Sequence, residues 1–256
     1  MNELVTSISI LGPAFLTGLL VLATHVPLGR EVLKRGIIFL DIAIAQIAGL
    51  GVILAISLDL QDNPLALQLI AVSSALLGAL LLHITEKIFP AFQEALIGSV
   101  FVLAATGALL LLANNPHGAE HLSDLLSGQI LWVSTTELLG LAGITLVILG
   151  CWKLLTPALR QRFFYPLFAI AITASVQLVG IYLVFSSLII PALAMRQVTQ
   201  HPVLKGYVLG LVAYGLGVIA SQIFDLPTGP VIVWLLAATA LVTALFINGR
   251  SQTRSQ

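Results

Sequence analysis

Charged residues and cysteines are both scarce in this sequence. Of 256 residues, 9% are charged and 59% are hydrophobic, and the mean hydropathy is +1.08. Soluble domains carry roughly 25% charged residues, so the composition excludes an ordinary soluble protein and indicates an integral membrane protein. The single cysteine, Cys151, excludes an internal disulfide and a cysteine-rich metal cage. Eleven basic and eleven acidic residues cancel, so no nucleic-acid partner is indicated.

Motifs for nucleotide binding and for hydrolysis are missing as well. The sequence has no G-x-x-x-x-G-K-[ST] pattern, and none of its lysines follows such a glycine run. It also has no H-E-x-x-H or G-x-S-x-G pattern. We therefore expect neither an enzyme nor a tightly bound cofactor. A membrane-embedded bundle with few polar groups favours the passage of a solute.

Long apolar runs are what the sequence has in abundance. Because about 20 residues cross a bilayer as a helix, they predict an all-α protein with eight or nine spans, forming one domain over residues 1–256. The expected spans are residues 4–26, 36–56, 65–84, 91–113, 135–152, a folded-back segment within 166–194, 205–224 and 231–248.

Basic residues predict the orientation of these spans. Connectors that carry Lys or Arg lie preferentially in the cytoplasm, and here they are residues 27–35, 85–90 and 153–165. The intervening connectors carry acidic residues and no Lys or Arg. We therefore expect the N-terminus outside, and the protein in a bacterial cytoplasmic (inner) membrane.

The apolar segment 166–194 is too long for one straight crossing and too short for two. If it folds back, all the basic residues that follow it lie in the cytoplasm. We therefore expect a turn at Ser186 and Ser187 and a short return segment that ends near Met195. The C-terminus then lies inside, and the polar tail of residues 249–256 is expected to be disordered.

The span at residues 36–56 carries one ionisable residue, Asp41. A carboxylate in hydrocarbon is costly and usually faces a cavity or a partner. Ala45 and Ala48 share its helix face, and small residues let another helix or a water-filled path come close. Two interpretations stay open: a helix that lines a route through the membrane, or a polar packing contact between helices.

The longest outer segment holds four potential metal ligands. His117, Glu120, His121 and Asp124 fall on one face if the chain is helical from Gly118 onward. Imidazole and carboxylate together suit zinc and similar divalent ions. The alternative is a hydrated loop whose polar face meets water.

The inner connector at residues 153–165 includes Arg160 and Arg162. Such a segment can dock a cytoplasmic partner. It can equally be the ordinary basic charge that cytoplasmic connectors carry.

Several segments resemble one family, the zinc/manganese/iron ABC-importer permeases. Residues 178–194 read LVGIYLVFSSLIIPALA, and residues 221–233 read SQIFDLPTGPVIV. The segments EALIG at 94–98, LSDLLSGQILWVS at 122–134 and RGIIFLDIAIAQIAGLG at 35–51 are also similar to that family. The resemblance covers nearly the whole chain, with its motifs in the family's order.

The resemblance implies a homodimeric permease of the type II ABC importer kind in the lipid bilayer. Two cytoplasmic ATP-binding subunits would bind below, and an extracytoplasmic metal-binding protein would deliver the ion above. Arg160 and Arg162 would then belong to the ATPase-docking surface.

The sequence departs from the family at two places. Family members often carry Gly-Asp in the second span, with a His four residues after that Asp. Here Asp41, Ile42 and Gln46 stand at the Gly, Asp and His positions. Asp41 and Gln46 are the candidate metal contacts that remain, about 140° apart on a helix. The second departure is the connector after Trp152, which is shorter than the family's.

We therefore predict the membrane subunit of an ABC importer for a divalent transition metal, zinc or manganese, as transported cargo. One rival is a permease of the same fold for a larger metal chelate, of the siderophore or cobalamin kind. The other is a secondary metal carrier, which would need coupling carboxylates near the membrane midplane.

Overall fold

Helices make up the fold of the described residues, which contain no strand. The computed structural model describes every residue except 1, 61–62, 114, 116–117 and 253–256, with side chains described from Leu11 to Phe246. The elements in chain order are α1 (Asn2–Arg35), α2 (Leu40–Ser57), α3 (Pro64–Ile88), the 3-10 turn η1 (Pro90–Phe92), α4 (Gln93–Leu112), α5 (Gly118–Ser127), the 3-10 turn η2 (Ile130–Trp132), α6 (Thr135–Leu154), α7 (Pro157–Ala194), α8 (Pro202–Phe224) and α9 (Thr228–Gln252).

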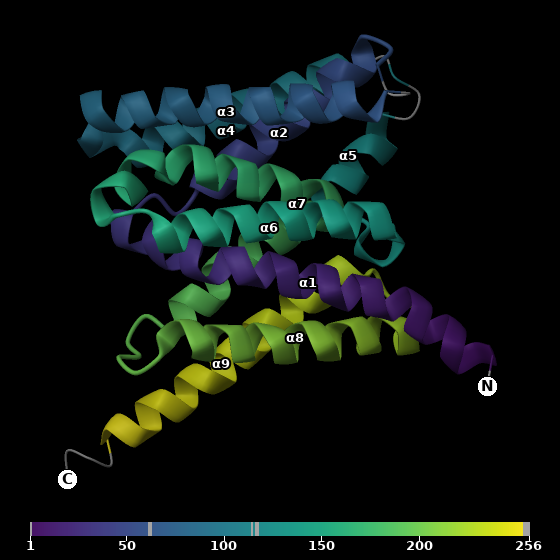
Figure 1. Ribbon diagram of the computed structural model, residues 1–256, viewed down its shortest axis with the longest axis vertical. Coiled ribbons are helices and arrows are strands. Elements are labelled where there is room, and N and C mark those ends of the chain that lie inside the picture. Colours follow the sequence, from purple (N-terminus) through teal and green to yellow (C-terminus); the bar gives the residue numbers. More distant parts are fainter. Residues whose placement is uncertain (1, 61–62, 114, 116–117, 253–256) are drawn as a thin grey trace.

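Within the described part of the chain, eight helices are long and apolar enough to cross a membrane, and α7 counts as one of them. This confirms the predicted all-α membrane protein. Figure 1 shows the long helices stacked side by side, with α3 and α4 at one end of the stack and α8 and α9 at the other. Helices keep their backbone hydrogen bonds internal, which is what a lipid environment demands. α9 extends to Gln252, into the tail expected to be disordered.

The prediction of a connector at residues 27–35 was wrong, because these residues form the last turns of α1. Pro27 lies inside the helix, and a packed membrane helix tolerates the missing N–H of a proline. The helical continuation brings Glu31 and Arg35 one turn apart, where Arg35 Nε donates to Glu31 Oε1 at 3.2 Å. Basic residues in the last turn also suit the negative end of the helix dipole.

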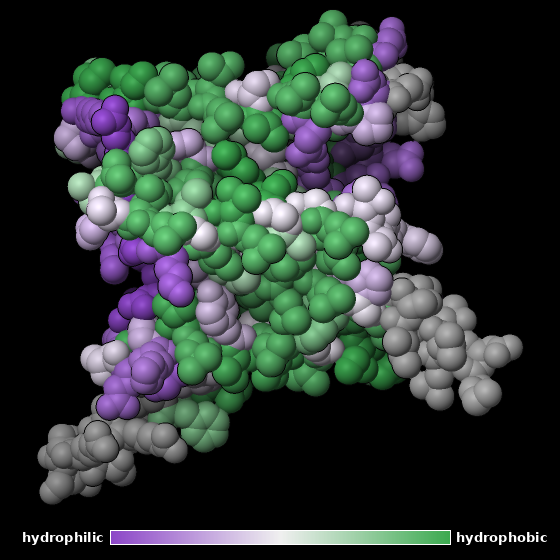
Figure 2. Space-filling model, in the orientation of Figure 1, coloured by the Kyte–Doolittle hydropathy of each residue, from purple (hydrophilic) through white to green (hydrophobic). Residues whose placement is uncertain are grey.

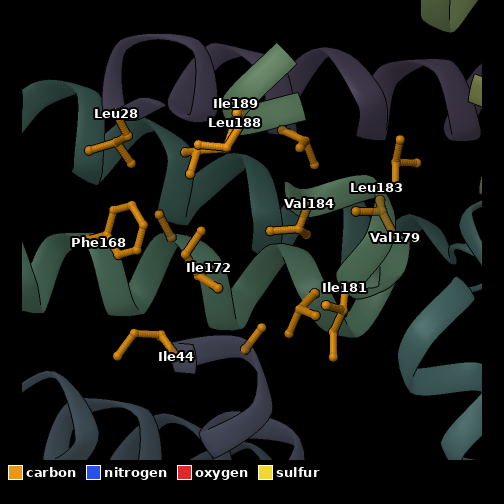
Figure 3. Packing of buried hydrophobic residues seen from close by; sticks show 14 of the residues in the cluster. Leu28, Ile44, Phe168, Ile172, Val179, Ile181, Leu183, Val184, Leu188 and Ile189 are labelled. Atoms are coloured by element: carbon orange, nitrogen blue, oxygen red, sulfur yellow. The ribbon is translucent and has the colours of Figure 1, made fainter. Parts of the chain in front are cut away.

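α7 lies at the centre of the bundle and packs against α1, α2, α3 and α9. Its backbone leaves the helical conformation at Gly180, which has φ 77° and ψ 164°. This divides α7 into a first limb, residues 157–179, and a second limb, residues 181–194, which we call the return limb. Figure 1 shows the return limb turning back toward the start of α8. Figure 3 shows residues of both limbs, such as Ile172 and Leu188, in one buried apolar cluster.

The break in α7 sits against a second glycine. Gly128, at the end of α5, also has a positive φ of 67°, and its backbone contacts that of Gly180. A Cβ added at Gly180 would lie 2.8 Å from the carbonyl oxygen of Leu126 and closer still to the Gly128 backbone. The N–H of Gln129 donates to the carbonyl oxygen of Leu178 at 3.3 Å, so one carbonyl next to the break is satisfied from outside the helix.

The chain therefore folds back as predicted, but the predicted turn at Ser186 and Ser187 was wrong. Both serines are helical, and their hydroxyls donate back to the carbonyl oxygens of Tyr182 at 2.7 Å and Leu183 at 2.6 Å. Serine satisfies itself in this way inside membrane helices. The conformation of Gly180 is open almost only to glycine, which explains why the break occurs there.

The reversal gathers the basic residues at one end of the bundle. The last turns of α1, α3 and α6 and the first turns of α7 and α8 all lie on the left in Figure 1. Figure 2 shows hydrophilic residues gathered along that side. These helix ends and the connector after α7 carry Arg30, Lys34, Arg35, Lys87, Lys153, Arg160, Arg162, Arg196 and Lys205. We call this end the basic face; it is the face that the charge pattern predicts to be cytoplasmic.

The Gly180→Ala substitution should destabilise the protein. The backbone conformation of Gly180 costs any other residue on the order of 1–3 kcal/mol, and the new Cβ would also meet the backbone of Gly128. We expect thermal unfolding in detergent to shift down by roughly 5 °C or more, since a few degrees correspond to each kcal/mol in a domain of this size.

The matched control is Gly140→Ala in α6, where an added Cβ meets nothing within 4 Å. That variant should unfold at the wild-type temperature or slightly above it, since alanine favours a helix over glycine. An unchanged unfolding temperature for Gly180→Ala would contradict the claim that the backbone break in α7 requires glycine at this position.

Candidate functional site

A cavity of about 570 Å³ lies beside α2, between α4, the return limb and α9. Ile42 and Gln46 face it together from α2, because they stand one helical turn apart. The return limb reaches this place only because α7 reverses at Gly180. We call it the α2–α9 cavity; its lining is Ile42, Gln46, Phe101, Leu126, Ile181, Tyr182, Phe185, Ser186, Pro230, Val233 and Trp234.

The α2–α9 cavity is apolar and aromatic, with few groups able to bind a cation. Gln46 is 4% exposed, and its Oε1 has no hydrogen-bond partner among the described residues. Ser186 already donates to the carbonyl oxygen of Tyr182. The lining contains no Asp, Glu, His or Cys. A bare divalent cation here would meet an amide oxygen but no anionic ligand from this chain.

Asp41 lies elsewhere, in the first turn of α2 rather than further along the span. It is 1% exposed, and neither carboxylate oxygen accepts a hydrogen bond of ordinary geometry from the described residues. Its charge interacts with that of Glu94, whose Oε1 accepts the N–H of Phe39 at 3.3 Å. The same helix face continues through Ala45, which is also buried. Asp41 is thus packed inside the bundle near the basic face, away from the α2–α9 cavity.

A smaller cavity of about 270 Å³ lies between α2, α5 and the first limb of α7. Two of the four predicted outer ligands, His121 and Asp124, line it together with Gln177. α5 begins at Gly118, as the predicted ligand face requires. We call this the outer cavity, because it lies at the end of α2 away from the basic face.

The other two predicted outer ligands do not line the outer cavity. Glu120 is exposed on α5, and His117 lies outside the described residues. Among the residues that the structure describes, no three His, Cys, Asp or Glu side chains come close enough to hold a metal ion. The outer cavity therefore offers at most one imidazole and one carboxylate from this part of the chain.

Arg160 and Arg162 lie in different surroundings. Arg160 donates from Nε to the carbonyl oxygen of Leu155 at 2.9 Å and from a terminal nitrogen to that of Lys153 at 3.4 Å. It therefore satisfies carbonyls at the end of α6, where intrahelical partners are missing. Arg162 is exposed and lines a groove between α3 and α7.

A cleft of about 650 Å³ opens at the basic face, between the ends of α1 and α6 and the starts of α7 and α8. Arg30 and Lys34 line it from α1, and Trp152 and Arg160 line it from the other side. Of the two arginines predicted to dock a partner, Arg160 therefore lines this cleft and Arg162 does not.

Sequence reasoning missed most of the α2–α9 cavity. Tyr182, Phe185 and Trp234 lie in runs that read simply as apolar spans. One signal was available: Gly180, in the segment LVGIYLV at residues 178–184, allows the chain to reverse and bring those aromatic residues to α2. The helical spacing of Ile42 and Gln46 could have indicated the shared face.

Comparisons with known proteins agree with this architecture. Residues 7–160 and 152–248 match the ABC 3 transport family. A Chlamydia trachomatis protein named "probable metal transport system membrane protein" is 25% identical over 241 residues, covering 85% of this chain and 82% of its own length.

Two solved structures show the same fold. PsaBC from Streptococcus pneumoniae, solved in complex with Fab, has a TM-score of 0.74 at 19% identity and covers 94% of each chain. A protein assigned as a metal-chelate type ABC transporter, in an inward-facing conformation, has a TM-score of 0.68 at 17% identity, covering 91% of this chain and 85% of its own. Because the family match spans nearly the whole sequence, the chain belongs to the ABC 3 transport family.

Proposed function

We propose that the chain is the membrane-spanning permease subunit of an ATP-driven importer for a divalent transition metal, zinc or manganese. The observation that carries this proposal is the family match over nearly the whole chain. The eight candidate spans among the described residues supply a membrane domain, and the sequence has no P-loop motif. The ATP would then be hydrolysed on separate cytoplasmic chains.

The path for the cargo, in this proposal, runs along the α2–α9 cavity. Tyr182 and Trp234 at its wall are 51% and 78% exposed, so an apolar aromatic surface stands open there. A second copy of the chain would cover this surface and complete the path from the other side. Gln46 would give the passing ion one weak contact, which favours release over trapping.

Cargo would arrive at the outer cavity, where His121 and Asp124 face an extracytoplasmic metal-binding protein. These two residues supply the imidazole and carboxylate that suit zinc and manganese.

Asp41 would act nearer the basic face, where its buried and unpartnered carboxylate attracts a cation. The ATPase subunits would bind the cleft at the basic face, over Arg30, Lys34 and Arg160, which caps the end of α6.

A second candidate function is supported by one observation, the chemistry of the α2–α9 cavity. Ile42 and Gln46 stand where family members often have Asp and His, and the rest of the lining is apolar or aromatic. Such a surface suits a bulky metal chelate better than a bare ion, because apolar walls bury apolar ligand surface. The fold is shared with a metal-chelate type transporter.

The two candidates predict opposite competition in transport. The permease, reconstituted with its ATPase subunits and binding protein, should take up radiolabelled manganese or zinc when ATP is supplied. Excess free zinc or manganese should abolish this uptake, whereas a siderophore or cobalamin should leave it unchanged. Uptake of a labelled chelate that free metal does not inhibit would overturn the divalent-ion proposal in favour of the second candidate.

The outer ligand pair can be tested by changing His121→Ala and Asp124→Asn together. Each contact to a charged group is worth roughly 1.5–3 kcal/mol, so the efficiency of metal uptake should fall by about tenfold or more. The matched control is Glu120→Gln, an exposed residue of α5 that does not line the outer cavity, and this variant should transport like wild type. Equal uptake by the double variant would remove the pair from the path.

A gain of metal binding should follow from Ile42→Asp combined with Gln46→His. The two new ligands would face the α2–α9 cavity one helical turn apart, in the spacing that lets two side chains share an ion. Cobalt added to the purified protein should then give the absorption bands of a bound ion, which wild type should lack. In the control pair, Ile42→Asp with Ile47→His, the two ligands lie about 140° apart around the helix and cannot share an ion. Cobalt absorption bands of equal strength in the control pair would contradict the shared-face geometry.

A further inference from the structure

A groove of about 850 Å³ runs between α3 and the first limb of α7, at the basic face. It shares no lining residue with the α2–α9 cavity. It adjoins the cleft at the bundle end, with which it shares Arg35, Ala158 and Gln161, and it differs from that cleft because α3 lines it. Arg35 of α1, Lys87 of α3 and Arg162 of α7 all line it. One acidic residue, Glu86, joins them, so the charged lining carries three positive groups against one negative.

The three cations differ in how they are already paired. Arg35 contacts Glu31 at 3.2 Å and Glu86 at 4.0 Å. Lys87 and Arg162 are exposed, and neither makes an ion pair with another described residue. The groove therefore presents uncompensated positive charge, and its ligand is expected to be an anion.

The groove also has an apolar part, which continues along α3 into the membrane. Leu80 and Leu76 line it, seven and eleven residues before Lys87. At 1.5 Å per residue these positions lie roughly 10 and 16 Å from the level of Lys87, a depth that belongs to the hydrocarbon core. Leu80 is 54% exposed. A cytoplasmic protein cannot reach this depth, whereas a lipid acyl chain can.

Two buried polar groups in the groove wall have no hydrogen-bond partner. Tyr165 is 1% exposed, and its hydroxyl makes no hydrogen bond of ordinary geometry with the described residues. Nδ1 of His83 likewise makes no hydrogen bond with these residues, and Glu86 Oε2 lies 3.7 Å from it. The ring centroids of His83 and Tyr165 lie 5.1 Å apart. Gln93 and Glu86 are the polar side chains nearest the Tyr165 hydroxyl. Because buried polar groups are nearly always paired, the hydroxyl keeps a hydrogen-bond donor that a polar ligand in the groove can use.

We propose that this groove binds an anionic phospholipid of the leaflet at the basic face. The phosphate-bearing head group lies between Lys87 and Arg162, with the Tyr165 hydroxyl as an additional donor. An acyl chain lies along Leu80 and Leu76. Each basic group next to an anionic lipid strengthens its binding about fivefold. The apolar strip formed by Leu76 and Leu80 fixes the orientation of the lipid.

The test is native mass spectrometry of the purified full-length chain, with phosphatidylglycerol and phosphatidylcholine of the same acyl composition. Wild type should retain phosphatidylglycerol in preference. Lys87→Gln with Arg162→Gln should weaken that binding by roughly 25-fold, since each basic group contributes about fivefold. The matched control, Lys153→Gln with Arg196→Gln, removes the same charge from the same face outside the groove and should leave binding unchanged.

Two further variants separate a lipid from other ligands. Leu80→Trp fills the apolar strip from an exposed position and should reduce phosphatidylglycerol binding without changing thermal stability. Tyr165→Phe should reduce phosphatidylglycerol binding about threefold, because it removes one neutral hydrogen bond. Soluble glycerol phosphate should compete only weakly, because it lacks the acyl chain.

Four results would overturn the proposal. One is an equal loss of lipid in both double variants, which would indicate general surface charge. Another is full competition by glycerol phosphate, which would indicate a soluble phosphate ligand. A third is unchanged lipid binding in Leu80→Trp. The last is loss of ATPase-subunit binding, with lipid binding intact, in Lys87→Gln with Arg162→Gln, which would make the groove a protein contact.

Discussion

The close approach of two glycine backbones, Gly128 after α5 and Gly180 within α7, is the constraint on which the rest of the structure depends. Neither position has room for a Cβ, and both have a positive φ. Lipid forbids unsatisfied backbone groups unless protein shields them. Here the short α5 supplies that shield, and the Gln129 N–H satisfies the carbonyl of Leu178. A break in the central helix thus becomes possible at membrane depth.

Two features of functional interest follow from that break. The return limb lies beside α2 and α9, and its Tyr182 and Phe185 form one wall of the α2–α9 cavity. The reversal also returns the chain to the basic face before α8 begins, so one end of the bundle carries the positive charge. The candidate path and the candidate docking face therefore have a common structural origin. Asp41 lines neither the α2–α9 cavity nor the cleft at the basic face and is held in the packed interior between them.

Composition and charge were sufficient to predict the helical membrane class and the reversal within residues 166–194. The helix from Gly118 was only a condition of the predicted ligand face, and the structure supplies it. The place of the reversal was missed: serines are common in turns, but Ser186 and Ser187 satisfy themselves within the helix. Of the predicted ligands, His121 and Asp124 share a cavity while Asp41 and Gln46 face different surroundings. Which helix faces meet is set by tertiary packing, and spacing along one helix cannot reveal it.

The central claim is that this chain is a conduit without its own motor. Proteoliposomes that hold the permease alone should neither hydrolyse ATP nor accumulate cargo, whereas the same vesicles with ATPase subunits and binding protein should accumulate it only when ATP is present. Hydrolysis of ATP, or uptake of cargo against its gradient, by the purified permease alone would contradict the account.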